Sequence, residues 1–453
     1  MKLFLPPLEI GDDEGFTPEK DIFRRKPVGD GLTNLVTSVD QPLVIALDAQ
    51  WGSGKSTFLK MWAGELRKQE IGVVLFDAFE NDYLEDAFTA IAGQIISLAK
   101  DKDKAQEGRV QRFAKRAYDA GKIVARSGLK IGIKAATVGA LEAEDFKDIA
   151  KEIGSEASSL GDKYLGESIT KQKEQQATIE QFREALSELP SLLSPPPAEP
   201  TETSQKPLVI IIDELDRCRP SFALEILERI KHFFAVPNIH FVLGVHLGQL
   251  ENSVNAAYGA NIDGRMYLQK FISLSVLLVD KKQDDGSYTP MRYAHWLAAQ
   301  LEIDEEARDT YARFIGGIAM ARHLSLRTLE KIFTNVAMTL AFSNRRTLRP
   351  TVIVAGLCVL RVTDPELYVL AKTGDLRWND VHEKLALSRQ TKDGESLNLE
   401  YIREMWQYCT DFQLSDEKIR EMRQGFMRHL VSDRKFILPH VAGNVMDRFL
   451  PSV

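Results

Sequence analysis

The sequence has few cysteines and no long apolar run, and both absences exclude classes of protein. Its three cysteines, Cys218, Cys358 and Cys409, are too few and too widely spaced in 453 residues for a disulfide framework or a metal knuckle. No segment approaches the roughly 18 apolar residues of a transmembrane helix. The eight histidines lack metal-ligand spacing, which argues against structural zinc. We therefore expect a cytoplasmic protein with no membrane span.

A secretory leader and an excess of basic charge are also lacking. The first residues, MKLFLPPLEI, break their apolar run with two prolines, so we expect no signal peptide. The formal net charge of −7 predicts no overall affinity for nucleic acid, although a local basic patch can still bind it. A hydrophobic fraction of 44% is typical of a globular protein, and the length allows two or three domains.

The stretch LDAQWGSGKST (47–57) carries the clearest chemical motif. Gly54, Lys55 and Ser56 supply the second half of the phosphate-loop pattern Gly-x-x-x-x-Gly-Lys-Ser/Thr, and Ala49 stands where its first glycine is usual. A buried-strand pattern precedes the motif and an amphipathic helix follows it, which is the context that this loop requires. Lys55 would reach the β- and γ-phosphates, and the Ser56 hydroxyl would hold Mg²⁺. The residues expected to bind ATP with Mg²⁺ are Gln50, Trp51, Gly52, Ser53, Gly54, Lys55, Ser56 and Thr57.

A second motif, LVIIIDELDR (208–217), is an apolar strand that ends in two carboxylates. Asp213 would bind Mg²⁺ through its water shell, and Glu214 would orient and activate the attacking water. Asp216 suits the first turn of a following helix. Arg217 is either a salt-bridge partner or a residue that faces a neighbouring subunit's nucleotide, and the sequence leaves both readings open.

Apolar runs and helical patterns together predict an α/β fold, a P-loop NTPase core with a parallel sheet. The expected strands are 43–48, 73–77, 208–213, 239–245 and 272–279. We divide the chain into an N-terminal segment with the first half of the core (1–99), a helical insertion (100–188), a Pro-rich linker (189–207), the second half of the core (208–289), and a helical lid and C-terminal domain (290–453).

WGSGKST and IDELDR, together with FDAFENDYLEDAF (76–88), YLQKFISLSV (267–276) and DPELY (364–368), resemble the KAP family of P-loop NTPases. The resemblance covers about residues 20–375. It implies an additional strand between the two motif strands and a catalytic glutamate. Members commonly carry membrane helices between the two motifs, which this chain lacks. Several bacterial members are linked to phage exclusion, so the resemblance also implies a role in anti-phage defence.

The resemblance further suggests residues that would sense the γ-phosphate. The strand that ends in His246, where the family usually has aspartate, should lie between the motif strands, so His246 is a candidate, with Gln249 a weaker one. A helix within RHLSLRTLEKIF (322–333) can pack over the site and place Arg327 or Arg322 against the phosphate, acting in cis or in trans. Without the resemblance, His246 reads as structural and the arginines as surface residues.

The insertion and the function each leave alternatives open. Residues 100–134 are rich in Lys and Arg, and the segment from 141 is mostly acidic. The two can pair as a helical hairpin, or the basic part can bind nucleic acid, an anionic membrane surface or a protein partner. We expect a Mg²⁺-dependent ATPase that works as a nucleotide-driven switch or assembly factor, self-associates and engages a protein effector. The alternative is an ATPase that acts directly on nucleic acid. The guanine-reading pattern Asn/Thr-Lys-x-Asp is missing, which disfavours GTP.

Overall fold

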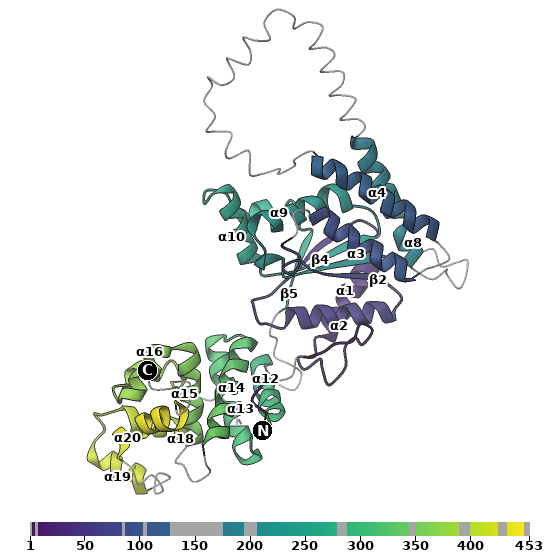
Figure 1. Ribbon diagram of the computed structural model, residues 1–453. Helices are drawn as coiled ribbons and strands as arrows, with labels where there is room; N and C mark the ends of the chain where they lie inside the picture. The colour runs from purple at the N-terminus through teal and green to yellow at the C-terminus, as the bar shows by residue number, and fades with distance from the viewer. Residues whose placement is uncertain are drawn as a thin grey trace, which may run out of the picture. The chain divides into compact units, whose positions relative to one another are not determined.

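The computed structural model contains two compact units (Figure 1). The α/β unit consists of Glu9–Gln50 and Lys55–Leu278, and the helical unit consists of Met1–Leu8, Trp51–Gly54 and Val279–Val453. The residues that the structure describes are 2–4, 8–83, 87–102, 107–126, 175–193, 206–278, 288–343, 350–388, 399–424 and 433–447.

The α/β unit is built on a five-stranded parallel sheet with the order β2-β3-β4-β1-β5. Its strands are β1 Val44–Asp48, β2 Gly72–Asp77, β3 Leu208–Asp213, β4 Ile239–Val245 and β5 Leu274–Leu277. All five match predicted strands. β4 lies between β1 and β3, which confirms the additional strand between the two motif strands. Every residue of β3 and β4 is buried, as their continuous apolar sequences require in a sheet covered on both faces.

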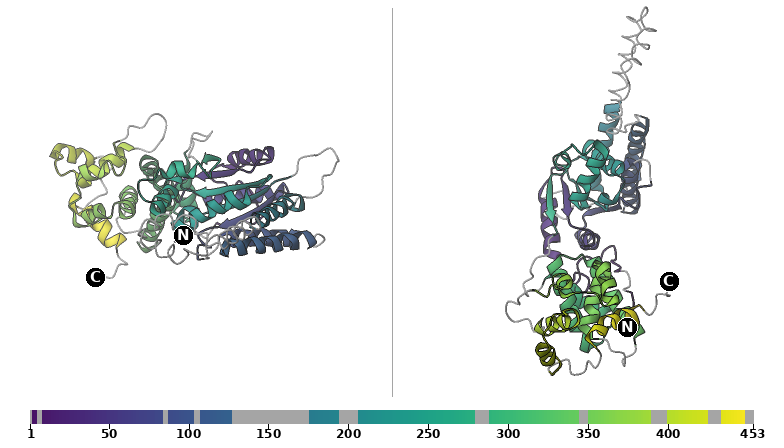
Figure 2. Two further views of the ribbon diagram at one scale, coloured as in Figure 1. Left: turned by 90° about the horizontal axis from the view of Figure 1, so that it is seen from above. Right: turned by 90° about the vertical axis from the view of Figure 1, so that its left-hand side faces the viewer.

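Helices cover both faces of the sheet (Figures 1 and 2). Along β3, Val209 and Ile211 point to the core shared with α1 (Lys26–Ser38) and α2 (Lys55–Lys68). Ile210 and Ile212 point to the opposite core. That core is shared with α3 (Ala87–Lys102), α9 (Pro220–Arg229) and α10 (Leu247–Tyr258). The alternation follows from the two-residue period of a strand. Shorter elements are Leu215–Arg217, Ile230–Phe234 and α11 (Gly264–Leu268).

The described parts of residues 100–188 are helical and pack into this second core. They include α4 (Glu107–Arg126) and a helix at 175–187, followed by α8 (Leu189–Leu193). Phe182 is fully buried, with its ring centroid 5.1 Å from that of Phe88 and 5.6 Å from that of Phe113. Residues 127–174, which contain the acidic arm, and residues 194–205 of the Pro-rich linker lie outside the described part.

Helices make up the described residues beyond 288, as the sequence predicts. They are α12 Thr289–Gln300, α13 Glu305–Arg322, α14 Leu326–Phe342, α15 Thr351–Thr363, α16 Pro365–Thr373, α17 Trp378–Val381, α18 Leu399–Thr410, α19 Asp416–Gln424, α20 Arg434–Pro439 and a last turn His440–Met446. In the described ranges, no helix is both long enough and apolar enough to cross a bilayer.

Candidate active site

Three carboxylates lie at the carboxyl edge of the parallel sheet. Asp48, Asp77 and Asp213 are the last residues of β1, β2 and β3. In the strand register Asp77 lies beside Asp213, and Asp213 lies beside Gly244 of β4. Because all strands run in the same direction, the loops that follow them gather at this one edge, where ligands of open α/β sheets bind.

The phosphate loop takes the backbone conformation that its glycines allow. Gly52 and Gly54 have φ angles of +72° and +81°, a left-handed region that side chains disfavour. Ala49 has no such requirement. Its φ is not positive, so it needs no glycine there. Its N–H donates to the carbonyl of Val245 at 3.1 Å. Alanine therefore fits at the strand exit in place of the usual first glycine.

Lys55 begins α2 and turns its side chain back toward the loop. Its Nζ donates to the carbonyl of Ala49 at 3.1 Å, and the residue is 8% exposed. Burial lowers the pKa of Lys55, while the nearby charges of Asp216, Asp213 and Asp48 oppose that shift. The sequence places Asp216 at a helix start, and the structure buries it among the acids that act on the motif lysine.

Asp213 is buried beside the Ser56 hydroxyl. Burial raises the pKa of Asp213, and hydrogen bonds from Ser56 and from the Glu214 N–H, at 2.9 Å to Oδ1, oppose the shift together with the charge of Lys55. A Cβ on Gly244 would lie 2.3 Å from this Oδ1, so glycine in β4 gives the carboxylate its space. A hydroxyl next to a carboxylate at a sheet edge is a hard-oxygen set that fits Mg²⁺.

Glu214 has a strained backbone and a paired carboxylate. Its φ of 58° and ψ of 24° place it in the left-handed region, which costs a non-glycine residue about 1–3 kcal/mol. Its Oε1 lies 2.7 Å from Nη1 of Arg217. Burial raises the pKa of Glu214, Arg217 opposes the shift, and Asp77 and Asp213 add to it. Of the two roles left open for Arg217, the salt bridge is therefore present within the chain.

His246 lies at the same edge, between β4 and α10. Its carbonyl accepts the N–H groups of Gln249 and Leu250, at 2.9 and 3.1 Å, so its backbone starts the helix. The next residue, Leu247, donates its N–H to Oδ1 of Asp48 at 2.9 Å. His246 follows the strand between the two motif strands, as expected. Its contact with a γ-phosphate stays a prediction. The Gln249 side chain accepts from Asn252 at 3.4 Å.

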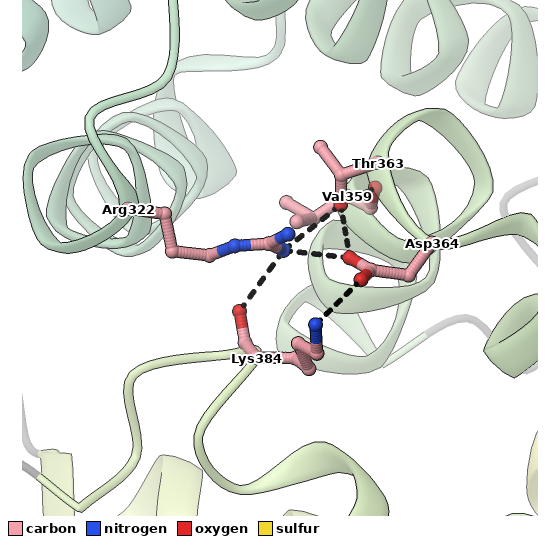
Figure 3. A network of polar contacts seen from close by, with 5 residues as sticks. All are labelled: Arg322, Val359, Thr363, Asp364 and Lys384. Carbon is pink, nitrogen blue, oxygen red and sulfur yellow. Dashed lines mark hydrogen bonds and ion pairs between the residues drawn. The ribbon is translucent and has the colours of Figure 1, made fainter.

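The two candidate arginines of the helical unit have different surroundings. Arg322 is held in the network of Figure 3, where Nη1 lies 2.7 Å from Oδ2 of Asp364 and 2.9 Å from Oγ1 of Thr363, and Lys384 also binds the aspartate at 3.1 Å. This network ties the end of α13 to the start of α16 and gives Arg322 a structural role.

Arg327 lies near the glycine turn, which groups with the helical unit. The N–H of Leu326 donates to the Gly52 carbonyl at 3.0 Å, and a Cβ on Gly52 would lie 3.0 Å from that of Arg327. The Ser325 hydroxyl caps the start of α14, because it accepts the Thr328 N–H at 3.1 Å. Of the two arginines, Arg327 therefore remains the candidate for contact with the γ-phosphate.

An ion pair that the sequence analysis did not single out fixes the segment after β2. The backbone N–H and Nε of Arg219 both donate to the carboxylate of Asp82 at 2.9 Å, which joins this segment to the start of α9. Phe79 and Tyr83 of the same segment are 50% and 79% exposed. The only sequence signal for this pair was the acidic and aromatic composition of residues 76–88.

The chain matches a protein family and is similar to several solved structures. The profile of the family described as "KAP family P-loop domain" matches residues 25–341. Among solved structures, the chain is similar to the ORC2 protein of Aeropyrum pernix in its ADPNP-ADP complexes, at 12% identity and a TM-score of 0.34, over 94% of this chain and 88% of that one. It is also similar to AMPPCP-bound DnaA from Aquifex aeolicus, at 10% identity and a TM-score of 0.31, over 98% and 99% of the two chains. No curated protein matches it significantly.

Proposed function

The chain belongs to the KAP family of P-loop NTPases, and we propose that it hydrolyses ATP with Mg²⁺ to drive a switch or an assembly step. Nucleoside triphosphate hydrolysis is the activity of this class of enzyme. The observation that carries the proposal is the grouping of Lys55, Ser56, Asp213 and Glu214 at one edge of the parallel sheet.

Each of these side chains has a role that its surroundings support. The N-terminus of α2 and the loop amides would hold the phosphates, and Lys55 would neutralise their charge. Ser56 and Asp213 would hold Mg²⁺, which supplies further charge neutralisation. Glu214 would accept a proton from the attacking water and is partly shielded from solvent. Arg217, paired with it, would fix the direction of its carboxylate.

The choice of ATP and the switch role rest on separate observations. The missing guanine-reading pattern favours ATP over GTP. The hydrogen bond from Leu326 to Gly52 links the turn that phosphates would order to the start of α14, and this link supports a nucleotide-driven switch. Contact of His246 and Arg327 with the γ-phosphate, self-association, a protein effector and a role in anti-phage defence remain predictions from the family resemblance.

The proposal is tested by comparing nucleotide binding and hydrolysis in two matched lysine variants. Lys55→Ala should abolish measurable ATP binding and hydrolysis. Lys60→Ala, on the exposed face of the same helix, should keep both. Chelation of Mg²⁺ should stop hydrolysis in the wild type, and competing GTP should displace ATP poorly. Hydrolysis by Lys55→Ala at the wild-type rate would refute the assignment.

A further inference from the structure

Three cationic side chains of the helical unit surround one aromatic ring. The guanidinium of Arg377 lies 4.3 Å from the ring centroid of Phe412, that of Arg434 lies 5.7 Å from it, and the ammonium of Lys435 lies 5.5 Å from it. We call these four residues the Phe412 cluster. They come from the start of α17, the residue pair after α18 and the start of α20, so the fold brings together cations that are distant in sequence.

The carboxylates of the same segments are bound to backbone amides. Asp380 accepts the N–H of Arg377 at 3.2 Å, and Asp433 accepts the N–H of Lys435 at 3.2 Å. Asp411 accepts the N–H of Gln413 at 3.0 Å. These acids start helices and turns, the three cationic groups lie around the ring, and Nη1 of Arg434 also donates to the Asp411 carbonyl at 3.0 Å. The three carboxylates offset part of the positive charge, and a phosphate placed against the three cations gains attraction from each of them.

Aromatic side chains adjoin the cations in sequence. Phe436 follows Lys435 and is 55% exposed, and its ring lies 5.7 Å from that of His440. Trp378 follows Arg377 and stacks on His382, with centroids 5.4 Å apart and planes 25° apart. Cations interleaved with accessible rings are the features by which proteins hold single-stranded nucleic acid, since cations meet the phosphates and rings stack on bases.

We propose that the Phe412 cluster, together with Phe436, binds single-stranded nucleic acid. Arg377, Arg434 and Lys435 contact the phosphates, and the exposed Phe436 ring stacks on a base. A nucleic-acid duplex is a poorer fit, because its bases are stacked on one another and cannot stack on Phe436. An anionic membrane is a poorer fit, because an interfacial helix needs a broad apolar face, whereas α20 is short and its Ile437 and Leu438 are buried. This surface is distinct from the basic residues 100–134 and is independent of the proposed hydrolysis.

The experiment measures fluorescence anisotropy of a labelled oligothymidine of about 20 nucleotides with the full chain, a length that exceeds one binding site. Three phosphate contacts predict that log K falls with log salt at a slope of about −2. Lys435→Glu should weaken binding about ten-fold or more, and Phe436→Ala should weaken it about five- to hundred-fold through lost stacking. Lys331→Glu makes the same charge change at an exposed position of α14 and should have little effect.

Several outcomes would overturn the proposal. Equal weakening by Lys435→Glu and Lys331→Glu would show a diffuse charge effect, and wild-type binding by Phe436→Ala would remove the stacking role. Binding to phosphatidylserine vesicles without binding to the oligonucleotide would assign the cluster to a membrane surface. Thermal unfolding checks each variant. Phe436→Ala keeps the test decisive if a charge variant fails to fold, because this ring is exposed.

Discussion

Replacing Gly244 by alanine tests the geometry of the metal-binding carboxylate with a single methyl group. Gly244 lies in the middle of the sheet, on the strand between the two motif strands. A Cβ at this position would lie 2.3 Å from Oδ1 of Asp213 and 2.6 Å from Cδ1 of Leu59. Both neighbours are buried, so neither can swing into solvent. We expect Gly244→Ala to displace Asp213 without removing it.

The magnitude follows from the distance. Contacts of a real Cβ essentially never fall below 3.0 Å, so the carboxylate oxygen must retreat by at least 0.7 Å, the difference between 3.0 and 2.3 Å. A displacement of about 1 Å in a catalytic constellation costs roughly 100-fold in rate. We therefore expect single-turnover hydrolysis to fall about 30- to 100-fold. Overpacking should also destabilise the unit by about 1–3 kcal/mol.

The assay is single-turnover ATP hydrolysis at saturating Mg²⁺, measured beside thermal unfolding. Gly31→Ala is the control, because a Cβ there meets nothing within 4 Å, and it should hydrolyse ATP normally. In an Asp213→Ala background, Gly244→Ala should cause little further loss, since the displaced group is gone. Hydrolysis by the folded single variant within about three-fold of wild type would refute the reasoning.

Three further predictions concern the water-activating acid, its arginine and the insertion. Glu214→Gln should keep ATP affinity but lower turnover by roughly two to four orders of magnitude. Asp213→Ala should instead weaken Mg²⁺-dependent ATP binding itself. Near-normal turnover of Glu214→Gln would mean that another residue is the base. Arg217→Ala should lower kcat about ten- to hundred-fold at unchanged KM, with part restored by Arg217→Lys, and a rise in KM alone would contradict an orienting role. Phe182→Ala should cost about 3–5 kcal/mol in chemical denaturation, and Tyr118→Ala, which is 65% exposed, about 0.5 kcal/mol or less; equal costs would mean that Phe182 is not a core residue.

The sheet and the order of its site residues could be predicted from the sequence for a physical reason. Strands buried on both faces leave continuous apolar runs, and a parallel sheet places the ends of such runs at one edge. Asp213 ends β3 and His246 follows β4, so both obey this rule, and the loop that carries Lys55 follows the end of β1. The observed strands all begin and end within two residues of the predicted ones, and the largest difference is at β5.

Side-chain packing around that edge could not be predicted, because it depends on distances between strands. The space that Gly244 leaves for Asp213 is a contact across two strands, and the sequence shows only a glycine within an apolar run. The burial of Asp216 near Lys55 depends on the short turn Leu215–Arg217, whose left-handed start at Glu214 has no glycine to signal it. Local sequence patterns identify the motif residues, but they do not identify the neighbours that position these residues and shift their pKa values.

The packing of the insertion (residues 100–188) could not be predicted from its composition either, and this packing limits where a partner can bind to it. Its charged composition suggested a helical hairpin with paired basic and acidic parts, or a basic surface for a partner. Phe182 packs against both Phe88 and Phe113, and all three rings belong to the core that α3 shares. One apolar face in a highly charged helix is enough to bury it, because the charged residues can occupy the opposite face. Any partner that docks on residues 110–121 must therefore use the exposed face of α4, where Tyr118 lies, and not the face that packs into the core.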